Sequence, residues 1–245
     1  GLSDPRHRVF RVWDLESGQE RVHSLADVTD SEWWGFWDVA FAPDGSLYVA
    51  GHGSARRLVL PDEPGGAVTS ETVFAARFTR SSLSRDGKLL LVQASETSHQ
   101  ELEQLHLLDL AHETSRRITS HGASLTVAIV DPAGRAIVSA DTEGAVRVGP
   151  ISGEEPHLLL GSRGRVSSLA VSPNGRWIAS ATDESIRLWP MPDVTKPPLH
   201  TLPYEELMAK LDTFTNQRVV RDPDSSTGWK LDIGPFPGWE DVPSW

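Results

Sequence analysis

The sequence predicts an all-β fold built from repeated four-stranded units. A turn of one kind recurs along the 245-residue chain at intervals of 42, 47 and 41 residues, at Pro43-Asp44-Gly45, Arg85-Asp86-Gly87, Pro132-Ala133-Gly134 and Pro173-Asn174-Gly175. Apolar and polar residues alternate on both sides of each turn, which is typical of half-buried strands. Four antiparallel strands per unit, at a period of about 40–45 residues, indicate the blade of a β-propeller.

The unit with the clearest pattern is Arg165–Met191. Its three alternating runs are separated by a turn at Ser172–Gly175 and a second turn at Thr182–Glu184. Runs of this length between such turns predict three consecutive antiparallel strands joined by tight hairpins. One such unit cannot bury both of its faces, so we expect it to recur and to pack against its neighbours.

The strands of the other units follow the same order. The predicted first strands are Asp38–Phe41, Arg80–Leu83, Leu125–Val130 and Val166–Val171. The second strands are Leu47–Ala50, Leu89–Gln93, Ala136–Ala140 and Trp177–Ala181. The third strands are Arg57–Leu60, Leu105–Leu110, Ala145–Ile151 and Ile186–Met191. Weaker fourth strands are Thr72–Phe74, Arg116–Thr119, His157–Leu160 and Leu199–Leu202, and the segment Gly51–Ser54 is expected to be a hairpin between second and third strands.

Three segments carry a family resemblance: RVWDLESGQERVHSL (Arg11–Leu25), VAFAPDGSLYVAGHG (Val39–Gly53) and LAVSPNGRWIASATDESIRLWP (Leu169–Pro190). They resemble WD40 repeats, and Trp13-Asp14 is a complete example of the dipeptide that names the family. Trp189-Pro190 and Gly149-Pro150 stand in the same place in altered form. The resemblance covers roughly residues 8–202.

In that family a blade is held by a polar tetrad: a tryptophan indole, a Ser or Thr, an Asp in a turn, and a His before the first strand. The resemblance therefore assigns Ser180, Asp183 and Trp189 to such a tetrad, with Trp13 and Asp14 as related structural positions. We expect Asp183 to accept the indole N–H of Trp189, because a buried indole needs an acceptor. No histidine occurs in residues 161–164, so this tetrad is incomplete. His121 stands where the family histidine would precede the next-to-last unit, but that unit has Gly149 in place of the tryptophan.

The count of units is four and a half. The full blades are expected at about residues 32–79, 80–123, 124–164 and 165–202, and residues 1–31 match only the third and fourth strands of a half blade. WD40 proteins usually form seven-bladed rings, and an open sheet edge is normally covered. We therefore expect either that the chain is the C-terminal part of a longer polypeptide of about seven blades, or that the missing strands come from another chain.

Aromatic residues are concentrated in the segment DSEWWGFW, residues 30–37. Two interpretations remain open for Trp33, Trp34, Phe36 and Trp37. Either alternate residues of the segment are buried between blades, or the segment forms an exposed patch that binds a partner, since aromatic residues often anchor interfaces.

The pattern changes after the repeats. Residues 203–245 are expected to form a small α+β extension: a helix at Tyr204–Phe214, strands at Arg218–Arg221 and Trp229–Ile233, and a Pro/Trp-rich tail that packs on the propeller. Pro203 and the acidic Glu205-Glu206 suit the start of the helix. The last forty-five residues resemble the endings of bacterial WD-repeat proteins that are associated with serine/threonine kinase modules.

Composition narrows the function classes. The formal net charge of −11 argues against nucleic acid as a partner. No stretch predicts a membrane span or a signal peptide, and the absence of cysteine is compatible with the cytoplasm. No catalytic motif and no spaced His or Cys set occurs, so we expect no catalytic residue, metal ion or cofactor.

Two functions follow from these observations. The first is a non-catalytic protein–protein interaction scaffold or sensor module of a bacterial signalling or regulatory protein, which binds partners through propeller loops. The alternative is a propeller enzyme with a site in the central channel, for which the inward Asp38 would be the residue to test.

Overall fold

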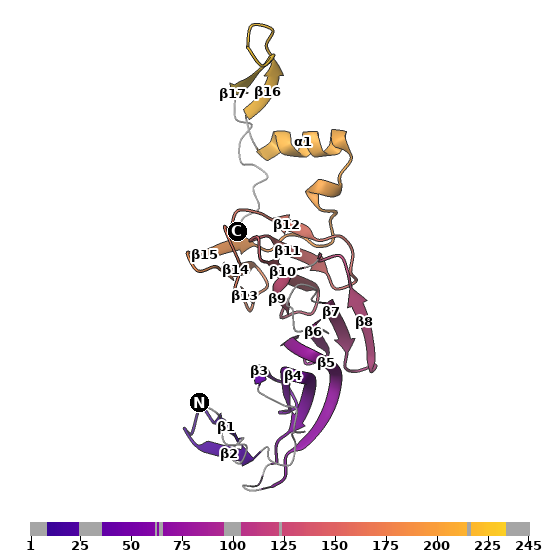
Figure 1. The fold of residues 1–245 in the computed structure, drawn as a ribbon, viewed down its shortest axis with the longest axis vertical. Coiled ribbons are helices and arrows are strands. Elements are labelled where there is room, and N and C mark those ends of the chain that lie inside the picture. The colour runs from indigo at the N-terminus through magenta and orange to yellow at the C-terminus, as the bar shows by residue number, and fades with distance from the viewer. Residues whose placement is uncertain are drawn as a thin grey trace. The chain divides into compact units, whose positions relative to one another are not determined.

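The computed structural model describes residues 9–24, 36–61, 63, 66–95, 104–122, 124–214 and 217–233. At positions 36, 37, 52, 77–79, 212–214, 217, 218 and 233 the backbone alone is described. The chain divides into two compact units, Gly1–Val194 and Thr195–Trp245 (Figure 1). We describe each unit by itself.

The first unit consists of antiparallel sheets in which each strand pairs with its neighbour in sequence. The first hairpin is β1 (Val9–Trp13) and β2 (Glu20–Ser24). A six-stranded sheet contains β3 (Phe36–Phe41), β4 (Leu47–Val59), β5 (Thr69–Leu83), β6 (Leu89–Ser95), β7 (Gln104–Asp109) and β8 (Thr114–Ile118). A four-stranded sheet contains β9 (Leu125–Val130), β10 (Ala136–Asp141), β11 (Val146–Pro150) and β12 (His157–Leu159), and the last sheet contains β13 (Ser168–Val171), β14 (Trp177–Ala181) and β15 (Ile186–Pro190). The predicted all-β propeller architecture is confirmed.

The repeated turn has a common backbone geometry. Gly45, Gly87, Gly134 and Gly175 all have positive φ angles, between 67° and 83°. In each case the glycine N–H donates to the carbonyl oxygen three residues earlier, at 2.8–3.0 Å. Only glycine adopts this left-handed conformation without a steric penalty, which explains why the residue recurs at this point of every unit.

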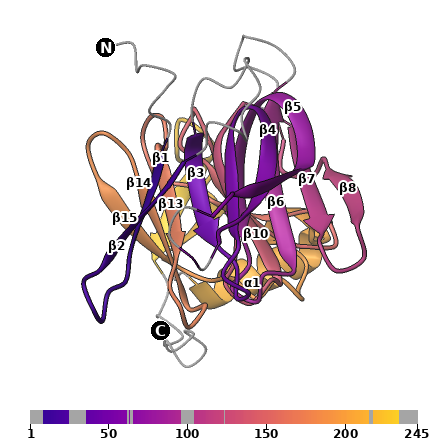
Figure 2. The same ribbon diagram turned by 90° about the horizontal axis from the view of Figure 1, so that it is seen from below.

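The chain does not reverse at the predicted hairpin Gly51–Ser54. Instead β4 continues through it, pairing with β3 up to Gly51 and with β5 from His52 onward. The ladder shifts register between His52 and Ser54, and Gly53 has a φ of 89°. A single left-handed glycine in a shifted ladder is typical of a β-bulge, which bends a strand rather than reversing it. Strand β5 likewise joins two predicted strands, the fourth strand of the first full blade and the first strand of the second. The first two predicted full blades therefore share one sheet, whose strands run from β3 at one end to β8 at the other (Figure 2).

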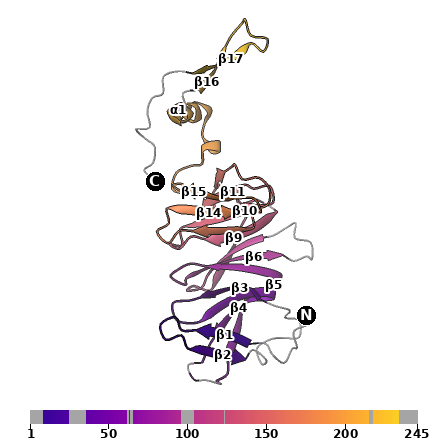
Figure 3. The same ribbon diagram turned by 90° about the vertical axis from the view of Figure 1, so that its left-hand side faces the viewer.

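Successive sheets of the first unit pack face to face (Figure 3). Leu91 and Leu107 of the six-stranded sheet share one apolar cluster with Val130 and Ile137 of the four-stranded sheet. Another cluster joins the opposite face of the four-stranded sheet to Leu169 and Ile178 of the last sheet. All six residues of β10 are buried, as expected for a strand that is covered on both faces.

The second unit contains the 3-10 helix η2 (Leu199–Thr201), the helix α1 (Tyr204–Phe214) and the hairpin of β16 (Gln217–Arg221) and β17 (Trp229–Ile233). The predicted α+β extension is therefore present. The first bond of α1 runs from the Leu207 N–H to the Pro203 carbonyl, and Glu205 and Glu206 lie in its positive first turn. The tail, residues 234–245, lies outside the described residues. None of the helices in the described part of the chain has the length and apolar character that crossing a bilayer requires.

The predicted strand Leu199–Leu202 is replaced by η2. Its backbone N–H groups at Thr201 and Leu202 donate to Pro198 and Leu199, and the Thr201 hydroxyl also donates to the Pro198 carbonyl. These local bonds curl the segment, so it does not supply a fourth strand to the last sheet.

Candidate functional site

Polar side chains of the first strands connect one predicted blade to the next. An Asp38 carboxylate oxygen on β3 accepts the Ser81 N–H of β5 at 3.0 Å. The Ser82 hydroxyl of β5 accepts the Val130 N–H of β9 at 3.1 Å. These contacts join residues more than forty positions apart, and sequence analysis missed them because a serine in a strand has no pattern that identifies its partner.

A third contact of this kind involves Thr126 of β9. Its buried hydroxyl lies 2.5 Å from the carbonyl oxygen of Val166, to which it donates, and 3.2 Å from that of Ala140. Val166 lies two residues before β13, the first strand of the last sheet, and is itself buried. The first strands therefore form a chain of polar contacts through the blade series, in addition to the apolar clusters.

Asp38 is the residue at which the enzyme interpretation would be tested. Burial raises the pKa of this carboxyl group, while the hydrogen bond from Ser81 and the positive charge of Arg80 work against the rise. The oxygen that it presents to Ser81 holds two first strands together. Within the described ranges, no group of three or more His, Cys, Asp or Glu side chains is arranged to hold a metal ion.

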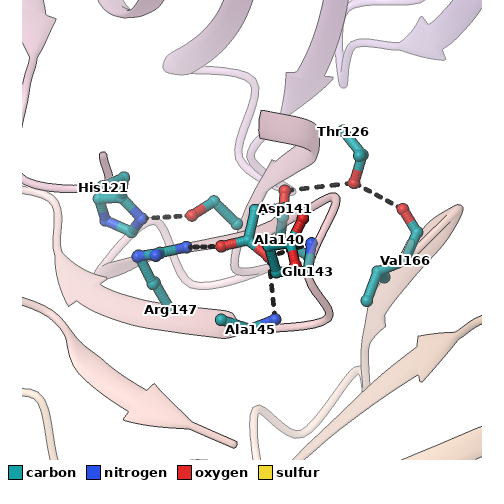
Figure 4. A network of polar contacts seen from close by, with 9 residues as sticks. His121, Thr126, Ala140, Asp141, Glu143, Ala145, Arg147 and Val166 are labelled. Carbon is teal, nitrogen blue, oxygen red and sulfur yellow. Dashed lines mark hydrogen bonds and ion pairs between the residues drawn. The ribbon is translucent and has the colours of Figure 1, made fainter. Parts of the chain in front are cut away.

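The histidine that the family resemblance pointed to lies in the turn before β9, beside the four-stranded sheet (Figure 4). His121 is buried, and its Nδ1 shares a hydrogen bond of 2.7 Å with the Ser139 hydroxyl of β10. Burial lowers the pKa of His121 to about 4, and the positive charge of Arg147 acts in the same direction. The imidazole is therefore neutral at physiological pH, and its contribution is structural.

Close packing explains why Gly149 stands where the family has tryptophan. A Cβ atom at Gly149 would lie 2.9 Å from Nε2 of His121 and 3.1 Å from Cβ of Pro156. The first distance is shorter than real Cβ contacts. The backbone of β11 can approach the imidazole this closely only because residue 149 has no side chain. The His121 ring occupies this space, and the indole of the family tetrad has no room.

Beside this pair, Asp141 organises the turn between β10 and β11. One carboxylate oxygen accepts the N–H groups of Glu143 and Ala145, at 2.9 and 3.0 Å. The other oxygen pairs with the Arg147 guanidinium at 2.6 Å (Figure 4). Both side chains are largely shielded from solvent, which strengthens the pair relative to one in water.

In the last sheet the structure joins two of the three predicted tetrad residues. The Trp189 indole N–H donates to the Ser180 hydroxyl at 2.9 Å, and Ser180 is buried. Asp183 is exposed at the tip of the turn that the Thr182 N–H closes onto the Ser185 carbonyl. The expected acceptor of the indole, Asp183, is therefore not the one used, because its turn projects into solvent.

Trp13 and Asp14 do not form a buried pair. The Trp13 side chain is exposed, and Asp14 accepts the N–H groups of Glu16 and Ser17 in the turn after β1. These bonds, with one from the Ser17 hydroxyl, lower the pKa of the Asp14 carboxyl group. Trp33 and Trp34 lie outside the described residues, and Phe36 and Trp37 are described only as the backbone that begins β3.

Apolar side chains are uncovered at both ends of the sheet series. At the first end, Phe10 packs on the cluster that contains Leu47 and Val49. Val39 and Phe41, cross-strand neighbours of Val49 and Leu47, are 57% and 60% exposed. They lie on the face that Phe10 of β1 partly covers, and the predicted half blade has no first and second strands to cover the rest.

At the other end, Ile186 and Leu188 of β15 are 75% and 68% exposed. They lie opposite Ala181 and Ala179, on the face of the last sheet that points away from the cluster containing Trp189. In the four-stranded sheet, Val146 and Val148 occupy the matching positions and are 0% exposed, because the last sheet covers them. The last sheet thus has the same apolar face as the four-stranded sheet, but no sheet of the described chain covers it.

Comparisons with known proteins agree with this architecture. The family model "WD domain, G-beta repeat" matches residues 153–190, from the turn before β12 to the end of β15. None of the curated proteins matches the chain. The crystal structure of TolB from Acinetobacter baumannii is similar, with a TM-score of 0.56 and 17% identity over 75% of this chain. The aligned part is 46% of that TolB chain, so this chain spans less than half of its length.

At this level of identity the likeness to TolB concerns the fold alone. The WD40 resemblance is confirmed for the repeat at residues 153–190 and the propeller fold for the sheets around it. The likeness of the tail to proteins associated with kinase modules stays a prediction.

Proposed function

We propose that this chain is a non-catalytic interaction module: a scaffold or sensor part of a bacterial signalling or regulatory protein in the cytoplasm. In this proposal it binds protein partners through its propeller loops, and further blades, from the same polypeptide or another chain, complete its ring. A WD40 repeat within a propeller fold supports the proposal, because such repeats present rigid surfaces on which loops carry specificity.

The observation that carries the proposal is the pair of uncovered blade faces. Inside the series, apolar faces are buried between sheets, as at Val138 and Val148. At the ends, Phe41 and Leu188 remain exposed on faces with the same alternation. Burial of apolar surface is worth about 25 cal/mol per Å², so aligned exposed side chains of this size indicate a surface that meets another protein.

The loop part of the proposal is tested at Trp33 and Trp34. A photo-crosslinking amino acid at position 34, introduced into the protein in its own cells, would capture the partner for identification by mass spectrometry. The affinity of the purified pair is then measured for the wild type and for Trp33→Ala/Trp34→Ala. We expect a loss of at least tenfold, since buried aromatic anchors dominate interface energetics. Glu155→Gln, a change in the turn before β12, is the matched control, and equal affinity for all three proteins would refute the loop assignment.

The ring part of the proposal is tested by intact mass. The protein isolated from its own cells is expected to be either substantially heavier than 26.8 kDa or bound to a second chain in fixed ratio. A free 26.8 kDa chain as the sole species would refute the additional blades and would leave the loop experiment unaffected.

A further inference from the structure

We propose that the outer edge of β15 binds an extended segment of a partner protein, which adds to the last sheet as its fourth strand. The segment carries an acidic residue between two apolar residues. The inference deepens the proposed interaction function by naming a second binding mode and the chemistry of its ligand, and it does not depend on the aromatic loop.

The backbone of β15 offers hydrogen-bonding groups at a regular spacing. The Met191 N–H donates to the Arg176 carbonyl, and the Thr182 N–H donates to the Ser185 carbonyl, so odd-numbered residues of β15 bond to β14. Antiparallel ladders alternate, and the N–H and C=O groups of Ile186 and Leu188 therefore point to the opposite side. That side is the edge of the sheet, because the strand order is β13-β14-β15.

The four-stranded sheet shows what such an edge accepts. Its ladder has the same phase, since the Ile151 N–H donates to the Arg135 carbonyl and the Asp141 N–H to the Ala145 carbonyl. The outward-pointing residues are then Val146 and Val148, and these pair with Leu159 and His157 of β12. In the last sheet, Ile186 and Leu188 hold the corresponding positions relative to the repeated turn.

The described chain supplies no strand for this edge. The segment that the sequence placed there forms η2, whose bonds are local. Ile186 and Leu188 remain among the most exposed large apolar side chains of the first unit. An unpaired edge with exposed apolar side chains is the surface to which an extended peptide adds by β-augmentation.

Arg187 indicates the charge of the partner segment. In the four-stranded sheet the matching Arg147 is paired with Asp141, but the last sheet has Thr182 at that position. The Arg187 guanidinium lies 5.9 Å from the Trp189 ring centroid, and among the described residues it has no carboxylate partner. Residues opposite Arg187 would form a non-hydrogen-bonded pair, in which side chains approach most closely, so an acidic residue there is favoured.

The same residue argues against a second copy of this chain as the occupant. Two β15 edges that pair about their centre would place Arg187 opposite Arg187, and like charges directly opposite are destabilising. The segment that fits is therefore apolar at the positions facing Ile186 and Leu188, and acidic between them.

The test uses the whole 245-residue protein and a fluorescent peptide, Lys-Thr-Val-Glu-Val-Thr-Lys, with blocked ends. Binding is measured by fluorescence anisotropy. We expect the Val-Glu-Val peptide to bind at least tenfold more tightly than its Val-Lys-Val counterpart. N-methylation of one valine, whose N–H would face β15, should abolish binding, whereas N-methylation of the glutamate, whose N–H would point away, should leave it within about threefold.

Matched protein variants test the same edge. Leu188→Pro removes an N–H that points to the edge, not to β14, and proline is tolerated at such positions, as Pro190 is on the same strand. We expect Leu188→Pro to weaken binding at least tenfold and Leu188→Thr, which keeps the N–H, by no more than about threefold. Thermal unfolding identifies any variant that fails to fold, and the methylated peptides then decide the question on the wild type.

Three results would overturn the proposal. They are equal binding of the two methylated peptides, equal binding to the two Leu188 variants, and a dimer in sedimentation that Leu188→Pro dissociates, which would make a second copy the occupant. A failure of this proposal can be distinguished from a failure of the proposed function. The partner captured through Trp34 should bind Leu188→Pro as tightly as it binds the wild type, whether or not the β15 edge binds a peptide.

Discussion

Gly149→Ala tests the packing of His121 against β11. The added Cβ would lie 2.9 Å from the His121 Nε2, and the ring has little freedom to retreat because Nδ1 is bonded to Ser139. Overpacking of a filled interior typically costs 1–3 kcal/mol, so we expect a loss of about 2 kcal/mol in the free energy of unfolding. For a domain of this size that corresponds to a fall in Tm of about 4–8 °C.

The sign of the effect makes this prediction decisive. Glycine inside a strand is itself unfavourable by roughly 0.5–1 kcal/mol relative to alanine, so an alanine without a clash would stabilise the protein. Urea unfolding followed by tryptophan fluorescence gives the free energy for the wild type, for Gly149→Ala, for His121→Ala and for the double variant. We expect Gly149→Ala to be destabilising in the wild type and close to neutral in the His121→Ala background. A stabilising Gly149→Ala in the wild type would refute the assignment of this space to the imidazole.

Three further outcomes follow from the polar contacts. Ser180→Ala should lower the free energy of unfolding by about 1–3 kcal/mol, because this change leaves the Trp189 indole without its acceptor. Asp183→Ala should change the free energy of unfolding by less than about 0.5 kcal/mol, because Asp183 is exposed. Urea unfolding compares the two variants, and equal effects would contradict the hydrogen bond between Trp189 and Ser180. Folding lowers the pKa of His121 from 6.5 to about 4, so the unfolded chain binds more protons than the folded chain between these pH values. The free energy of unfolding therefore falls as the pH drops through this window, by about 2 kcal/mol at pH 5. His121→Gln should lose this part of the pH dependence, and an unchanged pH profile in that variant would show that His121 is not its source. Thr126→Val removes the hydroxyl that donates to the next sheet and should cost about 1–2 kcal/mol by thermal unfolding, and a neutral result would mean that the contact does not hold the sheets together.

The candidate site was only partly accessible to sequence reasoning. The resemblance singled out Ser180 and Trp189, and the two side chains do meet. It also singled out Asp183, but that side chain is exposed. The motif could not show this, because it specifies a position in a turn but not the direction in which the turn projects. The link from Thr126 to Val166 was invisible, since it joins residues forty positions apart and leaves no pattern in either segment.

Strand pairing shows the same division. The left-handed φ at Gly45, Gly87, Gly134 and Gly175 follows from the residue itself, so the repeated turns were predictable. At Gly51–Ser54 the glycines permit either a hairpin or a bulge, and pairing of β4 with β5 selects the bulge. Local chemistry leaves this choice open because both backbones accept a left-handed glycine.

The sequence by itself determined the period, the turns and the alternation of the strands. These features depend on single residues and their near neighbours, so they do not change with the way the sheets pack. The tertiary structure decided which acceptor serves Trp189, why residue 149 is glycine, and which alternating face is covered. Identical alternation buries Val146 and Val148 but exposes Ile186 and Leu188, because burial depends on whether another sheet packs there and not on the strand that carries the side chain.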